Sequence, residues 1–96
     1  MELNIIWSEQ AAKGYSEILK YVDDNWTKKE VDRFEFEVRA FFDKLKKYPH
    51  LLQEVTTEGV RRGPINKHTI LTYKVDFEKS QLQVVNMRAA KQDPVE

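Results

Sequence analysis

The sequence has no cysteine among its 96 residues. Disulfide bonds, thiolate nucleophiles and thiolate metal ligands are therefore excluded together. Apolar residues never run for the roughly 18 positions that a membrane-spanning helix needs, and the first residues lack the basic start and cleavage site of a signal peptide. We expect a cytoplasmic protein with no membrane partner.

The motifs of common catalytic and cofactor sites are also missing. The chain has no glycine-rich phosphate loop, no nucleophile elbow and no histidine cluster with metal-ligand spacing. Asp23 and Asp24 are adjacent, and neighbours on a helix point about 100° apart, so we interpret them as a solvated helix end rather than a cation site. The sequence therefore predicts no cofactor and no metal.

The chain has no formal net charge at pH 7, but its positive and negative charges are unevenly distributed along the sequence. Residues 1–60 hold 9 Lys/Arg against 12 Asp/Glu, whereas residues 61–91 hold 7 Lys/Arg against 2 acidic residues. A basic second half suggests an acidic or polyanionic partner. The alternative is a chance distribution of charge in a small, highly charged protein.

Two segments have the apolar spacing of amphipathic helices. The first follows Ser8, a suitable N-cap, and its stripe is Ala11, Tyr15, Ile18, Leu19, Val22 and Trp26. Gly14 costs this helix about 1 kcal/mol relative to alanine, which suggests close packing there. Thr27 and Glu30 fit a capping box that starts the second helix. The second stripe, closed by Pro49, is Val31, Phe34, Val38, Phe41, Leu45 and Tyr48.

The remaining segments alternate as strands do. Leu3–Trp7 predicts a short first strand, and three more strands are expected around residues 60–66, 68–77 and 81–88. The chain is predicted to be one α+β domain over residues 1–96, with the order β-α-α-β-β-β. We expect a small antiparallel sheet of about four strands, with a helical hairpin (about 9–48) packed on one face. The β-rich basic half then covers about 52–88, and a tail covers 89–96.

Several segments, taken in order, resemble one protein family over nearly the whole chain. They are WSEQA at 7–11, ILKY at 18–21 with Trp26, LKKYP at 45–49, RRG at 61–63, ILTYKV at 70–75, VVNMR at 84–88 and QDP at 92–94. In this order and spacing, the chain resembles the RelE/ParE superfamily of toxins from bacterial type II toxin–antitoxin systems. The long hairpin with Trp26 at its turn is more similar to the ParE branch.

The resemblance implies a growth-inhibiting toxin that serves plasmid maintenance. A ParE-like toxin poisons DNA gyrase, whereas a RelE-like toxin cuts mRNA in the ribosome as an endoribonuclease. Both are held inactive in a hetero-oligomer with a cognate antitoxin. We expect the ParE-like activity, with gyrase as target; the alternatives are a RelE-like nuclease acting with the ribosome, and an inert toxin that only binds its antitoxin.

The candidate site residues are mostly cations of the second half. Arginine and lysine suit a phosphate, an aromatic ring can stack on a base, and histidine can move a proton near neutral pH. A nuclease would use Arg62, His68 and Arg88. Residues predicted to bind the target or nucleic acid are Arg61, Arg62, Lys67, Tyr73, Arg88 and Lys91.

We expect Arg61, Arg62 and Arg88 to share one concave face. The structural alternative for each arginine is an ordinary solvated side chain, and for His68 a surface or partly buried one. RelE-type nucleases carry a lysine-rich strand where this chain has residues 54–58, which hold no lysine, and Tyr-Arg where it has His68-Thr69. This departure favours the ParE-like interpretation, with no hydrolytic chemistry.

Overall fold

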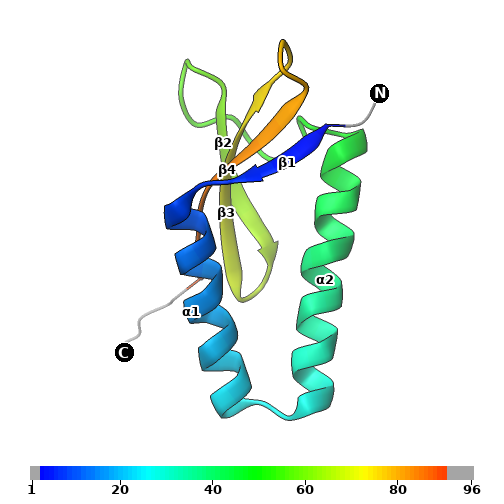
Figure 1. Ribbon diagram of the computed structural model, residues 1–96, viewed down its shortest axis with the longest axis vertical. Coiled ribbons are helices and arrows are strands. Elements are labelled where there is room, and N and C mark those ends of the chain that lie inside the picture. The colour runs from blue at the N-terminus through cyan, green and yellow to red at the C-terminus, as the bar shows by residue number, and fades with distance from the viewer. Residues whose placement is uncertain (1–2, 91–96) are drawn as a thin grey trace.

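The computed structural model describes residues 3–90 and has the predicted element order (Figure 1). Its helices and strands are β1 (Asn4–Trp7), α1 (Glu9–Asn25), α2 (Lys28–Lys47), β2 (Val60–Asn66), β3 (Thr69–Asp76) and β4 (Gln81–Ala89). The α+β class is confirmed. The predicted tail begins one residue too early, because β4 includes Ala89; Lys91 and the rest of that tail lie outside the described residues.

The helical hairpin turns where the capping residues predict. Ser8 Oγ accepts a hydrogen bond from the Ala11 N–H at 3.0 Å and starts α1. At the start of α2, the Glu30 N–H donates to Thr27 Oγ1 at 3.2 Å and the Thr27 N–H donates to Glu30 Oε1 at 3.0 Å. Because each residue satisfies a backbone donor of the other, α2 begins sharply and the two helices form the V seen in Figure 1.

The four strands form one sheet in the order β1-β4-β3-β2. Strands β2, β3 and β4 are antiparallel, as expected of strands joined by short connections. The sheet is nevertheless mixed, because β1 pairs with β4 in parallel, from Asn4 opposite Gln81 to Trp7 opposite Val84. A parallel neighbour needs a crossover connection, and here everything between the first and last strands supplies it.

The core lies between the helices and one face of the sheet. Buried residues of α2 are Phe34, Val38, Phe42 and Leu45. Phe41 is partly buried and packs against this core as predicted, and Phe42 beside it is buried more deeply. The prediction was wrong for Tyr48, which is 61% exposed. Tyr48 is the C-cap, outside the helical backbone, so the helical period no longer directs it inward. The other core residues are Leu3, Ala11, Ile18, Val22, Leu71, Tyr73, Leu82, Val84 and Met87.

A β-bulge in β4 explains its two adjacent valines. Thr72 is opposite Asn86 but Tyr73 is opposite Val84, so Val85 is the extra residue, and it is exposed. The bulge restores the inward direction of Met87 after Val84. Burial of β4 residues on one face therefore continues past the bulge from Leu82 to Met87.

Candidate functional site

The face of the sheet that is turned away from the core carries cations from three strands. Arg62 lies opposite Thr72, which lies opposite Asn86, and Arg88 lies opposite Ile70 on the same face of β3. The Arg62 Nε–H donates to Thr72 Oγ1 at 3.3 Å. Arg62 and Arg88 are exposed. We call this surface the open face; its polar residues include Arg62, Thr72, Lys74, Asn86 and Arg88, and Asp76, Gln81 and Gln83 lie on it toward the other end of β3 and β4.

Arg61 points to the opposite side from Arg62, because successive residues of a strand alternate in direction. The expectation that Arg61 shares a face with Arg62 and Arg88 is therefore wrong. Its Nη1 donates to the Leu52 carbonyl at 2.7 Å, and its Nη2 lies 3.7 Å from Glu54 Oε1. With 17% of its side chain exposed, Arg61 fastens the segment between α2 and β2 to the sheet.

His50 also contacts Arg61 and helps to hold the segment between α2 and β2 on the sheet. Arg61 Nη2 lies 2.7 Å from His50 Nδ1. Because a guanidinium only donates, Nδ1 is the acceptor in this hydrogen bond. The ring also stacks on Phe77, with centroids 5.8 Å apart. His50 therefore has a structural position.

Tyr73 belongs to the core and is fully buried. Its hydroxyl donates to the Pro49 carbonyl at 2.6 Å and accepts from the Leu52 N–H at 3.4 Å. Burial raises the pKa of this hydroxyl, and the Leu52 hydrogen bond and the nearby Arg61 charge oppose the rise. In this position the ring offers no surface on which a nucleic-acid base could stack.

Lys67 and His68 form the turn between β2 and β3. The His68 N–H donates to Asn66 Oδ1 at 2.8 Å, and its ring lies edge-on to Trp26, with centroids 4.6 Å apart. Trp26 packs against the core from the hairpin turn, so the His68 ring lies on the helix side of the sheet, away from Arg62. Lys67 is exposed beside a hollow of about 630 Å³ that Arg33 and Glu37 also line.

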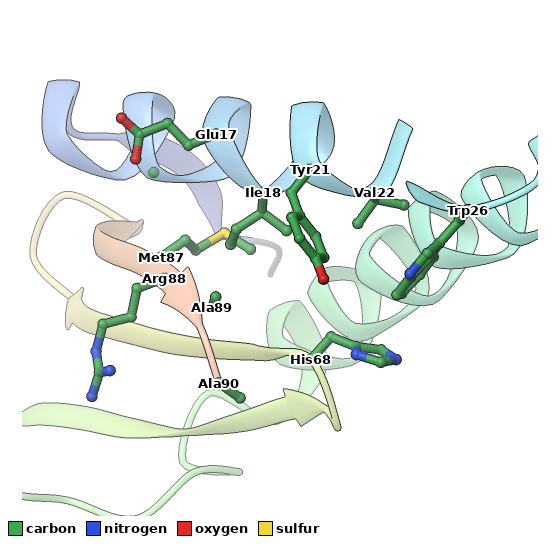
Figure 2. Close-up of a pocket in the computed structure, with 11 residues that line it drawn as sticks. Glu17, Ile18, Tyr21, Val22, Trp26, His68, Met87, Arg88, Ala89 and Ala90 are labelled. Atoms are coloured by element: carbon green, nitrogen blue, oxygen red, sulfur yellow. The ribbon is translucent and has the colours of Figure 1, made fainter. Parts of the chain in front are cut away.

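A cavity of about 540 Å³ separates the second half of α1 from the end of β4 (Figure 2). Gly14 marks where the two elements touch, since a β-carbon there would overlap the Met87 carbonyl oxygen. Beyond that contact the elements diverge, and Figure 2 shows the Arg88 guanidinium directed away from α1. We call this cavity the α1–β4 groove; its lining includes Ile18, Tyr21, Val22, Trp26, His68 and Met87–Ala90. Sequence reasoning missed the groove itself, and Gly14 was its only signal.

The described part of the chain holds neither a metal-binding cluster nor a membrane-spanning helix. In residues 3–90, no group of three or more His, Asp or Glu side chains could hold a metal ion. None of the described helices is long and apolar enough to span a membrane. The open face can bind an anion through its cations, whereas the groove presents mainly apolar side chains.

Solved structures with the same architecture include a toxin–antitoxin complex. The RelBE2 toxin–antitoxin complex of Mycobacterium tuberculosis matches with a TM-score of 0.62 and 14% identity, over 93% of this chain and 99% of the other. The archaeal RelE–RelB complex of Pyrococcus horikoshii matches with a TM-score of 0.60 and 16% identity, over 97% of this chain and 100% of the other. The YoeB dimer of Staphylococcus aureus matches with a TM-score of 0.58 and 22% identity, over 92% of this chain and 97% of the other. At these identities the matches establish the fold alone.

This chain thus shares the small α+β fold of these structures. The family model described as ParE toxin of type II toxin–antitoxin system, parDE, matches residues 5–94. This match spans nearly the whole sequence, and the chain belongs to the ParE toxin family. A search of curated proteins gives no match.

Proposed function

We propose that this toxin stops growth by binding DNA gyrase, with no hydrolytic chemistry of its own, and that a cognate antitoxin holds it inactive. The observation that carries the proposal is the separation of the residues a nuclease would need. Arg62 is on the open face, whereas the His68 ring packs on Trp26 on the helix side. Arg88 lines the α1–β4 groove together with His68, but its guanidinium is directed away from α1 and not toward the His68 ring (Figure 2). A proton-transferring group must lie within hydrogen-bond reach of the reacting atom that the cation binds, and neither arginine converges with the His68 ring.

The test is induction of the chain alone, followed by two assays on the purified protein. We expect growth to stop, gyrase supercoiling to be inhibited with accumulation of cleaved DNA complexes, and ribosome-bound mRNA to remain intact. Ribosome-dependent cuts in mRNA with normal supercoiling would reject the gyrase proposal. Normal growth despite strong expression would favour an inert toxin that only binds its antitoxin.

The second candidate is a ribosome-dependent endoribonuclease, and the position of Arg62 and Arg88 favours it. Both cations lie on the open face, with Lys74 on the same surface, so they can hold a phosphate backbone. Under this alternative the protein would bind mRNA through the open face and would need a proton-transferring group other than His68.

A double variant, Arg62→Ala with Arg88→Ala, separates the two candidates. We expect it still to stop growth at strong induction, because loss of these two residues would weaken binding to the target without removing a bond-breaking step, and a high toxin concentration offsets weaker binding. The matched control removes two exposed arginines of α2, Arg33→Ala with Arg39→Ala. Loss of toxicity together with loss of mRNA cleavage, in the open-face variant alone, would establish the nuclease.

A further inference from the structure

The two edge strands of the sheet differ in how their outer backbone groups are covered. At β2, the Val55 N–H donates to the Val60 carbonyl at 2.8 Å. The Arg62 N–H donates to the Gln53 carbonyl at 3.0 Å, so the segment before β2 covers the first half of this edge. Pro64 has no N–H, and a bulge follows it. Coverage, proline and bulges are the features by which natural sheets prevent further pairing at an edge.

The opposite edge strand, β1, has none of these features. Its residues, Asn4–Trp7, include no charged side chain and no proline. Ile6 is 44% exposed and Trp7 is 37% exposed. Figure 1 shows β1 lying between the start of α1 and the end of α2, and β4 is its only neighbour in the sheet that residues 3–90 form. β1 is therefore an apolar edge that is open to another strand.

Two hydrogen bonds determine which backbone groups of β1 point outward. The Asn4 N–H donates to the Ser80 carbonyl at 2.8 Å and the Ser8 N–H donates to the Val84 carbonyl at 3.0 Å, both toward β4. Backbone groups of a strand alternate in direction with a period of two residues. The N–H and C=O groups of Ile5 and Trp7 therefore point away from β4, where nothing in residues 3–90 pairs with them.

We infer that two copies of this chain pair through β1, antiparallel about a two-fold axis at Ile6, so that their sheets become continuous. Antiparallel strands exchange hydrogen bonds between residues whose backbone groups face each other. Placing Ile5 opposite Trp7 of the second copy meets this condition, and the two-fold axis repeats the pair with the roles exchanged. The pairing then has about four backbone hydrogen bonds, two for each pair of residues.

The side chains on both faces of β1 suit this register. Trp7 lies on the helix side, with ring centroids 5.6 Å from Tyr15 and 5.5 Å from Phe42, and its exposed part can cover Ile5 of the second copy. Ile6 points to the other face. At the axis it meets Ile6 of the second copy at a position without backbone hydrogen bonds, where opposing side chains are closest. The pairing therefore removes exposed apolar surface on both faces.

The charges beside β1 are complementary under the same axis. A hollow of about 390 Å³ between β1 and α2 is lined by Glu35, Arg39, Asp43 and Lys46. Their signs alternate along α2, and none of the four forms an ion pair within residues 3–90. When two such rows face each other in opposite directions, Arg39 lies opposite Asp43 of the second copy and Glu35 lies opposite Lys46. Each cation thus meets an acidic side chain, which favours a second copy as the occupant of this edge.

The small size of the strands limits the strength of the dimer. Two strands of four residues with their flanking side chains bury less than the ~1,600 Å² of a standard interface. We expect a dissociation constant of about 1–100 μM. The pairing uses neither Arg62 and Arg88 nor the α1–β4 groove, so it goes beyond the proposed function and does not depend on it.

The experiment is sedimentation equilibrium of the full chain from about 1 μM to about 1 mM, a range that brackets the expected dissociation constant. We expect monomers at the low end and dimers at the high end. Ile6→Lys should stay monomeric, because it places two like charges at the axis. Phe36→Lys is the matched control, since Phe36 is an exposed aromatic residue of α2 that does not line the hollow; it should dimerise as the parent protein does.

A mixture of two variants tests the symmetry itself. Ile6→Glu alone should also stay monomeric, whereas Ile6→Glu mixed with Ile6→Lys should form dimers, because the two-fold axis then brings opposite charges together. Hydrogen exchange on the unsubstituted chain gives a measurement that needs no variant. The N–H groups of Ile5 and Trp7 should exchange about tenfold more slowly at the high concentration than at the low one.

A chain that is monomeric up to about 1 mM would overturn the inference, since the edge would then have no second copy as its occupant. Dimers that persist in Ile6→Lys, with no change in the exchange of Ile5 and Trp7, would also overturn it, because the copies would then meet at another surface. In both cases the supercoiling and mRNA assays still decide the proposed function separately.

Discussion

At the scale of single residues, Thr69 is the clearest unfavourable feature of the core. It is fully buried at the start of β3, and its hydroxyl oxygen is a buried side-chain atom with no hydrogen-bond partner among the described residues. An unsatisfied buried hydroxyl costs about 1–3 kcal/mol. The shape of threonine is therefore useful at this position while its polarity is not.

Thr69→Val is expected to raise the free energy of unfolding by about 1 kcal/mol, because it exchanges the unpaired hydroxyl for a methyl of similar size. Urea denaturation monitored by tryptophan fluorescence measures the change. Thr72→Val is the control, since the Thr72 hydroxyl accepts from Arg62 Nε and its removal gives no such gain. A destabilised Thr69→Val protein would mean that the hydroxyl has a partner after all.

At the scale of elements, α1 and β4 depend on the glycine between them. Gly14→Ala is expected to destabilise the protein by about 1–3 kcal/mol, because the added methyl overlaps the Met87 carbonyl. This exceeds the ~1 kcal/mol that alanine adds to an isolated helix. Thermal unfolding measures the balance. Ser16→Ala, on the exposed side of the same helix, should be slightly stabilising, and a similar gain at Gly14 would contradict the contact.

The segment between α2 and β2 depends on Arg61. Arg61→Ala removes the donors to Leu52 and His50 and the ion pair with Glu54. We expect a loss of about 1–2 kcal/mol and faster limited proteolysis within residues 48–59. Arg61→Lys keeps the charge but loses the planar guanidinium group with its several donors. Its stability and its cleavage rate should therefore lie between those of the parent protein and of Arg61→Ala. Equal cleavage rates in all three proteins would show that Arg61 does not hold the segment.

The same elements explain how far sequence reasoning reaches. Local patterns placed both helices, the Thr27–Glu30 capping box and the second strand at residues 60–66, because each depends on neighbours in sequence. The face on which Arg61 or Tyr73 lies depends on register with distant strands. The parallel partner of β1 is about 77 residues away in sequence, and no local period encodes such a pairing. The face of Arg61 and the parallel pairing of β1 were not predicted correctly.

At the scale of the whole molecule, two tyrosines make the free energy of unfolding decrease at alkaline pH. Burial raises the pKa of Tyr73, and burial together with Glu35 raises the pKa of Tyr15, both above the ordinary value of 10.0. Tyrosine is neutral when protonated, so above pH 10 the unfolded chain loses these protons before the folded one does. The stabilisation is complete below pH 10 and is lost as pH rises through the folded-state pKa values.

We expect the free energy of unfolding to fall steeply above pH 10. Tyr73→Phe should be less stable at neutral pH by about 1–2 kcal/mol, because it leaves the Pro49 carbonyl without its donor. Its decline above pH 10 should also be shallower than that of the parent protein. Urea denaturation at several pH values tests both effects, with the exposed Tyr21→Phe as control. An unchanged slope in Tyr73→Phe would exclude a contribution from Tyr73.

The pairing of β1 with β4 also determines when the sheet can be completed during synthesis. The first strand finds its only pairing partner in the last one, among the strands of the described residues. A nascent chain leaves the ribosome with its N-terminus first, so β1 stays unpaired until residues 81–84 have emerged. The core strand β4, which carries Leu82, Val84 and Met87, arrives at the same late stage. The sheet therefore cannot be completed before β4 has emerged, and a chain that terminates before residue 81 lacks the strand that joins β1 to β3.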